Sequence, residues 1–258
     1  MKVVILAGGY GTRISEESHL RPKPMIEIGE KPILWHICKY YGSFGFNEFV
    51  ICCGYRGYMI KEYFADYYLH RSDVTFDFSN GGRMEIHTNV SEPWKVTLVD
   101  TGADAQTGGR VKRVAPYIGG ERFMLTYGDG VSDVDLNALL AQHEKSGKTV
   151  TLTAIQPGGR FGVLDIEGDS VTAFKEKAVE NGGWINAGFM VAEPELFSYI
   201  DDDGTVLERA PLERLSAERK LGVYRHGGYW ACMDTQRDKA ALEAAWASGQ
   251  ARWKVWKD

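Results

Sequence analysis

A glycine-rich loop near the N-terminus constrains the fold of this chain more than any other stretch. Before it, residues 3–7 form an unbroken apolar run, which is typical of a strand buried on both faces, as in a parallel sheet covered by helices. Gly8, Gly9 and Gly11 then follow within four positions. Glycine permits positive φ and lets a ligand approach the backbone closely, and N–H groups exposed in this way form an anion site. The loop therefore predicts a phosphate-binding turn after a buried strand.

The loop does not match either of two well-known phosphate-binding glycine motifs in full. A Walker P-loop would close with Gly-Lys-Ser or Gly-Lys-Thr, and neither triplet follows. The dinucleotide fingerprint is met only in part, since Gly9-x-Gly11 is present but Ile14 stands in place of the third glycine. This disfavours a nicotinamide-dependent oxidoreductase, while an ordinary tight turn stays open as an explanation of the glycines.

The stretch Arg21-Pro22-Lys23-Pro24 strengthens the phosphate interpretation. A residue that precedes proline favours extended backbone, so we expect both Arg21 and Lys23 to be extended. Alternate residues of an extended segment share a face, which would place both cations on the same side. Lys23, held between two prolines, is expected to be a pre-positioned positive charge.

Composition limits the fold class and the kinds of partner. A chain of 258 residues, 44% of them hydrophobic, is large enough for one α/β domain with an ample core. Its formal net charge of -5 argues against a general nucleic-acid binder. The four cysteines show no Cys-x-x-Cys spacing, so we expect reduced, buried thiols in a cytoplasmic protein. The N-terminal apolar run is too short for a signal peptide or a membrane span, and no membrane partner is expected.

Alternating strand and helix patterns predict a doubly wound α/β sheet in the first part of the chain. Each expected strand ends in a turn that contains glycine, and parallel strands would bring these turns to one edge, where such sheets bind ligands. The helix that begins at Asp135 carries Leu136, Leu139, Leu140 and His143 on one face and should end at Gly147. We expect His143 on the helix surface. The expected strands are 3–7, 48–53, 96–99 and 123–127, and the expected helices begin after Pro32 and include 58–68 and 107–117.

From Thr149 onward the pattern indicates a more mixed or antiparallel sheet, which could supply the pocket for a second substrate. Thr235 begins a pattern typical of a capping box, and the helix after it is lined by Leu242, Ala245 and Trp246. The expected strands are 149–155, 163–166, 171–174, 184–192 and 221–225, and the expected helices are 194–200 and 206–219.

Two aspartates are candidate metal ligands. Asp129 lies between glycines at a strand end, and Asp234 lies just before the helix cap. Each has a simple structural explanation, because Asp-Gly is a common turn dipeptide and an aspartate before a helix complements its dipole. A polyphosphate bound by a negatively charged protein calls for Mg²⁺, which takes one or two carboxylates together with phosphate oxygens. If the fold brings them together, Asp129 and Asp234 are the expected Mg²⁺ ligands.

Motifs along the whole chain resemble those of the sugar-1-phosphate nucleotidyltransferases. The resemblance implies a Rossmann-like, mixed and mostly parallel sheet in a single domain over residues 1–258. Residues 1–148 would form the nucleotide-binding half, and residues 149–258 a mixed or antiparallel sugar-binding half with the C-terminal helices. The motifs are Leu6-Ala7-Gly8-Gly9-Tyr10-Gly11-Thr12-Arg13, Pro22-Lys23-Pro24, Tyr127-Gly128-Asp129, Glu176-Lys177 and Met233-Asp234-Thr235. Ile51-Cys52-Cys53-Gly54-Tyr55, Glu92-Pro93-Trp94, Val99-Asp100-Thr101-Gly102 and Thr107-Gly108-Gly109-Arg110 are similar to the members that use CTP and glucose 1-phosphate.

The resemblance also implies a role for each motif. The glycine loop and Lys23 would hold the triphosphate, segment 102–110 would lie near the cytosine ring, and Lys177 would meet the sugar phosphate. The family usually has a proline directly after this lysine, whereas this chain has Ala178. The missing proline loosens the segment around Lys177. The implied catalytic residues are Arg13, Lys23, Asp129 and Asp234, of which the two aspartates bind Mg²⁺. The implied nucleotide-binding residues are Leu6, Ala7, Gly8, Gly9, Tyr10, Gly11, Thr12, Arg13, Lys23, Ala105, Arg110 and Gly128, and the implied sugar-phosphate-binding residues are Tyr127, Gly162, Glu176, Lys177 and Asn186.

The implied reaction joins CTP and α-D-glucose 1-phosphate to give CDP-glucose and pyrophosphate. Uridylyl and thymidylyl transfer are alternatives, because base choice depends on a few hydrogen bonds that a sequence does not place. A non-catalytic nucleotide-sugar-binding homologue is another. The resemblance further implies a homo-oligomer, with a hexamer as one candidate size, and a place in nucleotide-sugar synthesis for the lipopolysaccharide O-antigen.

Overall fold

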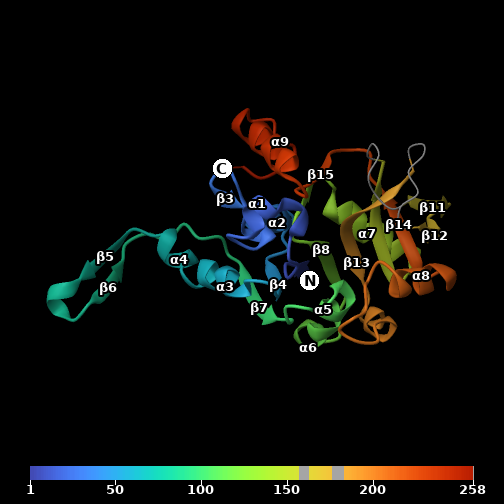
Figure 1. The fold of residues 1–258 in the computed structure, drawn as a ribbon, viewed down its shortest axis with the longest axis horizontal. Coiled ribbons are helices and arrows are strands. Elements are labelled where there is room, and N and C mark those ends of the chain that lie inside the picture. Colours follow the sequence, from blue (N-terminus) through green and yellow to red (C-terminus); the bar gives the residue numbers. More distant parts are fainter. Residues whose placement is uncertain (157–162, 176–182, 258) are drawn as a thin grey trace.

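A nine-stranded sheet runs through the body of the molecule (Figure 1). The structure, a computed structural model, describes residues 1–156, 163–175 and 183–257. From edge to edge the strands are β11 (Val163–Glu167), β12 (Ser170–Lys175), β14 (Leu221–Arg225), β10 (Val150–Ile155), β13 (Ile185–Ala192), β8 (Phe123–Tyr127), β1 (Lys2–Leu6), β4 (Glu48–Cys53) and β7 (Lys95–Asp100). Strands β12 and β13 run opposite to the other seven. The predicted mixed and mostly parallel α/β sheet is therefore confirmed.

Four neighbouring strands, β8, β1, β4 and β7, are parallel and carry the predicted glycine turns at their carboxyl ends. Leu6 at the end of β1 lies opposite Tyr127 of β8 and Cys52 of β4. Cys53 in turn lies opposite Asp100 of β7. These strand ends form one edge of the sheet, as the sequence predicted.

Side chains of β1 alternate between two cores, one on each face of the sheet. Val3 and Ile5 belong to a cluster that includes residues of helix α2 (Ile33–Ser43) and the C-terminal Trp253. Val4 and Leu6 belong to a second cluster with residues of α5 (Thr107–Arg113), α6 (Ala115–Ile118) and α8 (Ala210–Ala217). Burial on both faces explains why β1 is apolar without interruption.

Further helices are α1 (Ser15–Ser18), α3 (Gly57–Ala65), α4 (Tyr67–His70), α7 (Leu136–Ser146) and α9 (Gln236–Ala247), and short 3-10 segments cover Thr12–Ile14, Lys23–Met25, Phe78–Asn80 and Pro194–Tyr199.

The helix ends that the sequence predicts at two places are confirmed. Asp135 caps α7 by accepting hydrogen bonds from two backbone N–H groups, and Gly147 ends this helix with a φ of 60°. Thr235 caps α9 and forms a capping box with Asp238.

Prolines change the extent of two predicted helices. The helix expected over 107–117 is divided at Val114, because Pro116 lacks the N–H group that would continue the first segment. The helix expected over 206–219 begins only at Ala210, where Pro211 fits the first turn of α8. The helix expected over 58–68 is divided at Asp66 into α3 and α4.

The expectation that His143 lies on a helix surface is wrong. Its side chain is buried, and its ring nitrogens lie 2.9 Å from the Thr151 hydroxyl and 3.2 Å from a Glu193 oxygen. The reason is the spacing itself, since His143 continues the apolar stripe of Leu136 and Leu139 that packs on the sheet. Burial lowers the pKa of His143.

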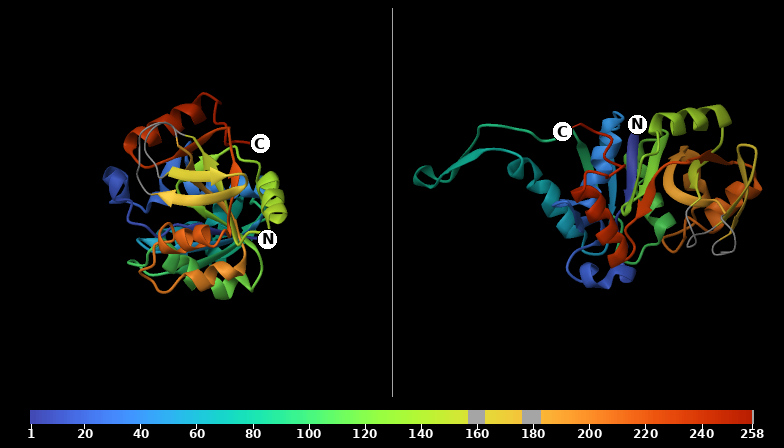
Figure 2. Two further views of the ribbon diagram at one scale, coloured as in Figure 1. Left: turned by 90° about the vertical axis from the view of Figure 1, so that its right-hand side faces the viewer. Right: turned by 90° about the horizontal axis from the view of Figure 1, so that it is seen from above.

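A hairpin arm reaches away from the body of the molecule (Figures 1 and 2). It follows α3 and α4 and pairs β5 (Val74–Asp77) with β6 (Arg83–Ile86). Gly81 and Gly82 lie in the turn between these strands, and both adopt positive φ. In the part of the chain that the structure describes, no helix is both long and apolar enough to cross a membrane. The four cysteines are free thiols, and three of them are buried as expected, namely Cys38, Cys52 and Cys53.

Candidate active site

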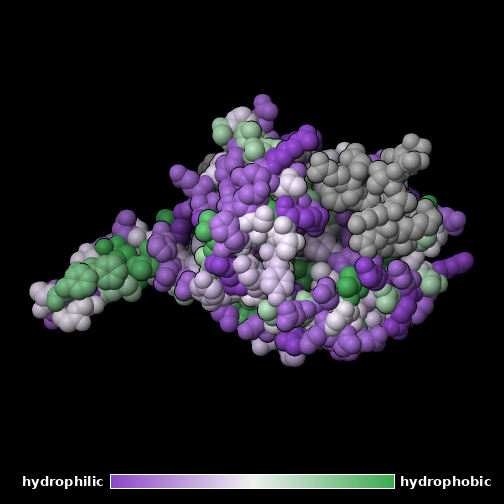
Figure 3. Space-filling model, viewed as in Figure 1, coloured by the Kyte–Doolittle hydropathy of each residue, from purple (hydrophilic) through white to green (hydrophobic). Residues whose placement is uncertain are grey.

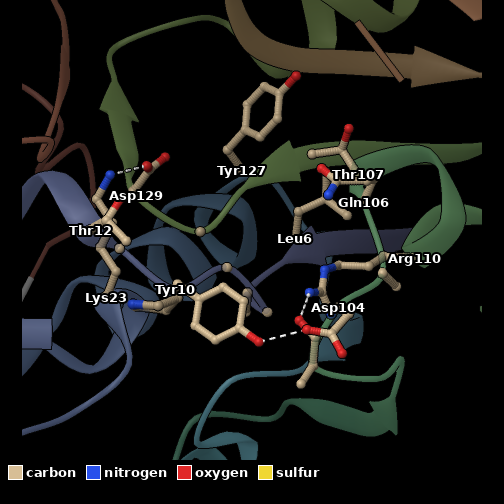
Figure 4. Close-up of a pocket in the computed structure, with 18 of the residues that line it drawn as sticks. Leu6, Tyr10, Thr12, Lys23, Asp104, Gln106, Thr107, Arg110, Tyr127 and Asp129 are labelled. Carbon is tan, nitrogen blue, oxygen red and sulfur yellow. Dashed lines mark hydrogen bonds and ion pairs between the residues drawn. The ribbon is translucent and has the colours of Figure 1, made fainter. Parts of the chain in front are cut away.

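A cavity of about 540 Å³ opens at the carboxyl edge of the parallel strands (Figure 4). Its walls come from the loop after β1, the 3-10 segment that contains Lys23, the loop before α5 and the end of β8. Every residue that the resemblance assigned to the nucleotide lines this cavity, namely Leu6, Ala7, Gly8, Gly9, Tyr10, Gly11, Thr12, Arg13, Lys23, Ala105, Arg110 and Gly128. Tyr127 and Asp129 line it as well.

Packing explains why the loop after β1 requires glycine at two of its positions. A Cβ atom at Gly8 would lie 2.2 Å from Nη1 of Arg110. Gly11 has a φ of 66°, which L side chains rarely adopt. The backbone N–H of Tyr55 donates to the Gly8 carbonyl at 3.0 Å, and this bond ties the loop to the turn after β4.

Lys23 joins the two predicted metal ligands. Its Nζ atom lies 2.5 Å from Oδ2 of Asp129 and 2.5 Å from Oδ1 of Asp234, while Nη1 of Arg13 lies 2.6 Å from Oδ2 of Asp234. Burial of Lys23 acts to lower its pKa, but the two carboxylates outweigh burial and the pKa is raised. Burial acts to raise the pKa of Asp234, but the charges of Lys23 and Arg13 lower it overall. Lys23 and Asp234 are therefore both charged at neutral pH.

The backbone at Lys23 differs from the prediction. Lys23 begins a 3-10 segment instead of lying extended, because the N–H of Met25 bonds the Pro22 carbonyl at 2.8 Å. Arg21 pairs with Glu27 at 2.6 Å and does not join Lys23 at the cavity. The expectation that both cations share a face is wrong, since this turn overrides the local preference of residues before proline.

A small two-stranded sheet brings the two aspartates together. Strand β9 (Gly130–Ser132) pairs with β15 (Trp230–Cys232), and Gly130 lies opposite Cys232. Asp129 immediately precedes β9, and Asp234 lies two positions after β15. The N–H groups of Asp234 and Thr235 both donate to the Asp238 carboxylate, so the start of α9 fixes the backbone at Asp234.

The donor set at these aspartates suits a hard divalent cation. Two carboxylates adjoin the glycine loop, and carboxylate oxygens are preferred ligands of Mg²⁺. Over the described residues, no group of three or more His, Cys, Asp or Glu side chains is placed to hold a metal ion. The remaining ligands would have to be phosphate oxygens and water, which is the usual arrangement for Mg²⁺.

Arg110, predicted to lie near the base, holds the loop before α5 in place. Its guanidinium group is buried and donates to the carbonyl of Gly102 at 2.6 Å and to that of Ala103 at 3.0 Å. Across the cavity, the Tyr10 hydroxyl donates to Oδ1 of Asp104 at 2.7 Å (Figure 4). The Tyr10–Asp104 hydrogen bond thus ties the glycine loop to the loop before α5.

The predicted sugar side is described in part. Tyr127, at the end of β8, donates a hydrogen bond to Glu208, and Asn186 on β13 accepts one from the N–H of Gly188 at 2.9 Å. Gly162, Glu176 and Lys177 lie outside the described residues.

The sequence did not single out Glu208, which also lines the cavity. It lies in the segment before α8 and touches Thr107, which is 101 positions away. No local pattern marks it, because only tertiary contact brings it to the site. Pro24, Ala103, Asp104, Gln106 and Thr107 also line the cavity, and each falls within a stretch that the sequence had marked.

Comparison with known proteins gives consistent matches over the whole chain. The nucleotidyl transferase family model matches residues 2–231. The chain is 54% identical over 258 residues, covering 100% of both proteins, to glucose-1-phosphate cytidylyltransferase of Salmonella typhi. It is 28% identical to D-glycero-alpha-D-manno-heptose 1-phosphate guanylyltransferase of Campylobacter jejuni, over 77% of this chain and 78% of that one. The solved structure of HddC from Yersinia pseudotuberculosis has the same fold, with a TM-score of 0.76 at 22% identity over 95% of this chain and 99% of that chain.

Proposed function

Because this chain belongs to the nucleotidyl transferase family, whose members transfer a nucleotidyl group to a sugar 1-phosphate, we propose that it acts on CTP and α-D-glucose 1-phosphate. The products would be CDP-glucose and pyrophosphate. The observation that carries this choice of substrates is the 54% identity, along the full length, to a glucose-1-phosphate cytidylyltransferase. The cavity supports it by grouping the glycine loop, Arg13 and Lys23 beside two aspartates.

The proposed chemistry requires positioning more than proton transfer. An oxygen of the sugar phosphate attacks the α-phosphorus of CTP in line, and pyrophosphate leaves from the opposite side. A phosphate monoester has a second pKa of about 6, so the nucleophile is already mostly a dianion at neutral pH and needs no general base. The difficulty is bringing two anions together and stabilising the departing charge, and fixed cations and N–H groups do both.

The residues of the cavity divide this work between them. We assign the triphosphate to the loop of residues 8–13 and to Lys23, whose ammonium group is held in place by two carboxylates. Arg13 lies at the cavity wall with a largely exposed side chain and would stabilise the departing pyrophosphate. Asp129 and Asp234 would hold Mg²⁺, which when bound supplies positive charge to the phosphate oxygens. Ala105 and Arg110 would position the base.

The sugar side of the proposal rests on fewer described residues. Tyr127 lines the cavity, and we assign Tyr127 and Asn186 to the sugar phosphate. Gly162, Glu176 and Lys177 keep the roles that the sequence predicts for them.

We also propose that the protein is a homo-oligomer in which the hairpin arm contacts another subunit, with a hexamer as one candidate size. Phe76, Phe78 and Met84 are exposed on the arm, and the two phenylalanine rings lie 6.2 Å apart. Figure 3 shows apolar surface gathered there. An isolated two-stranded hairpin is marginally stable in water, and an apolar patch of this kind marks an interaction site. The measurement is the mass in solution of the wild type and of Phe78→Ser, which should form a smaller species.

We place the reaction in the cytoplasm and its product in nucleotide-sugar synthesis for the lipopolysaccharide O-antigen, as the resemblance implies.

The test of the reaction is a matrix of four nucleoside triphosphates against several sugar 1-phosphates, with and without Mg²⁺. Pyrophosphate release should be fastest with CTP and glucose 1-phosphate and should require the metal. Faster release with UTP or dTTP would favour uridylyl or thymidylyl transfer, and no release with any pair would favour a non-catalytic homologue.

A further inference from the structure

Glu208 places a carboxylate in the wall of a cavity whose expected ligands are anions. The residue lies in the segment before α8 and is half-buried. Among the described residues, its hydrogen-bond partners are two neutral hydroxyl groups, those of Thr107 and Tyr127. A negative charge in this position would repel phosphate, so it requires an explanation from some other part of the ligand.

Both hydroxyl groups donate to Glu208, and that of Thr107 is oriented by a second hydrogen bond. Oγ1 of Thr107 accepts from the N–H of Leu207 at 2.9 Å and donates to Oε2 of Glu208 at 2.6 Å. The Tyr127 hydroxyl donates to Oε1 of the same carboxylate. Burial, followed by the charge of Glu208, raises the pKa of Tyr127 far above its ordinary value, so its proton is retained. The network thus fixes the carboxylate between α5 and the end of β8.

The carboxylate keeps acceptor capacity after these bonds are made. An ionised carboxylate offers about four acceptor sites, and the two protein hydroxyls occupy two of them. Free acceptor sites attract hydroxyl donors and repel phosphate oxygens. Carboxylates bind ribose hydroxyls in this way in dinucleotide-binding folds.

We propose that Glu208 is a substrate-binding residue that accepts a hydrogen bond from a sugar hydroxyl of a bound substrate. The donor is either the ribose of the nucleotide or the hexose of the sugar 1-phosphate, since both present such groups. This inference rests on the proposed function, because it requires that both ligands enter this cavity. It adds a specificity-determining residue that holds the neutral part of a ligand while the cations hold the phosphates.

The test compares wild type, Glu208→Gln and Glu208→Asp on substrates that each lack one hydroxyl. The probes are 2′-deoxy- and 3′-deoxy-CTP, and glucose 1-phosphate lacking the hydroxyl at carbon 2, 3, 4 or 6. On the complete substrates, both variants should lose roughly 10- to 100-fold in kcat/KM, the range for a hydrogen bond to a charged group. On one deoxy substrate, wild type and variants should be nearly equal, and that substrate identifies the ribose or the hexose as the donor.

Thr107→Val is the matched control, because it removes a protein hydroxyl from the carboxylate and leaves the substrate contact in place. Its loss should be the same on complete and deoxy substrates. The proposal is overturned if the Glu208 variants lose equally on every substrate, if they change the preference between CTP and UTP instead, or if both fail to fold while Thr107→Val folds. If wild type prefers another pair of substrates, the proposed function fails, and the same deoxy series built on that pair still tests Glu208.

Discussion

The Nζ atom of Lys23 lies 2.5 Å from Oδ1 of Asp234, although 211 positions separate the two residues along the chain. The same atom lies 2.5 Å from Oδ2 of Asp129. Pairing of β9 with β15 produces this meeting, because it brings the segment after Asp129 beside the segment before Asp234. Lys23, Asp129 and Asp234 therefore form one charged cluster. Replacing any one of them should change the electrostatic environment of the other two.

Replacement of Lys23 by alanine should lower kcat for pyrophosphate release by roughly 10²–10³, the cost of removing one charge-stabilising donor. The variant also leaves Asp129 and Asp234 without their shared ammonium group. Lys95→Ala is the matched control, since Lys95 forms an exposed ion pair with Glu48 at 3.5 Å and should change activity little. Turnover of Lys23→Ala within a few-fold of wild type would remove Lys23 from the mechanism.

Replacement of Asp234 by alanine should abolish the Mg²⁺-dependent activity, because one of the two proposed carboxylate ligands of the metal is lost. The measurement is the initial rate as a function of Mg²⁺ concentration. Asp203→Ala serves as the control, since Asp203 forms an exposed ion pair with Arg113 away from the proposed metal ligands. An unchanged metal titration in Asp234→Ala would leave this residue with a structural role only, at the start of α9.

The sequence predicted the parts of this site that local pattern governs. The apolar run of β1 and its glycine loop were recognisable because burial on two faces and close backbone approach leave a compositional trace. Lys23 lines the cavity as predicted. Its backbone is not extended, although residues before proline favour that conformation, because the N–H of Met25 closes a turn on the Pro22 carbonyl. His143 was misplaced because a polar residue was expected at the surface, although its helical spacing put it on the buried apolar stripe of α7. The position of Glu208 in the cavity could not be predicted from the sequence, since it depends on contact with Thr107, which is 101 positions away.

Replacement of Gly54 by alanine should weaken nucleotide binding without touching the ligand. A Cβ atom at this position would lie 2.4 Å from Nη1 of Arg110 and 2.5 Å from the Gly8 carbonyl oxygen, so the glycine loop must shift. We expect at least about a tenfold rise in the Kd for CTP, since a small displacement of binding groups is costly. The free energy of unfolding should fall by about 1–3 kcal/mol, as for overpacking elsewhere.

Gly227→Ala provides the comparison for this substitution, because a Cβ atom there would meet no other atom within 4 Å. Calorimetric titration and urea unfolding should leave this control close to wild type. Equal CTP affinity in the Gly54 and Gly227 variants would show that the loop accommodates the methyl group and that its packing does not set nucleotide affinity.

His36 provides a prediction about stability that is independent of catalysis. It is buried on α2 beside Trp246 and Trp253, with ring centroids 4.7 Å and 6.2 Å away. Its Nε2 atom bonds the Ile28 carbonyl at 2.8 Å, and Nδ1 accepts from Nε1 of Trp253 at 3.4 Å. Burial, opposed in part by backbone bonds to Ile28 and Lys31, lowers the pKa of His36 from 6.5 to about 4.

Lowering the pH from 7 to 4 should therefore destabilise the protein through His36. Between these pKa values the unfolded chain binds a proton that the folded protein excludes, so the stabilisation is complete above pH 6.5 and is lost as the pH falls toward 4. The full loss is about 3 kcal/mol, from about 1.4 kcal/mol per pKa unit. Urea unfolding at several pH values should show a shallower decline for His36→Gln than for wild type, while the exposed His19→Gln should follow wild type. Parallel curves for wild type and His36→Gln would contradict the prediction, because the proton would then bind elsewhere.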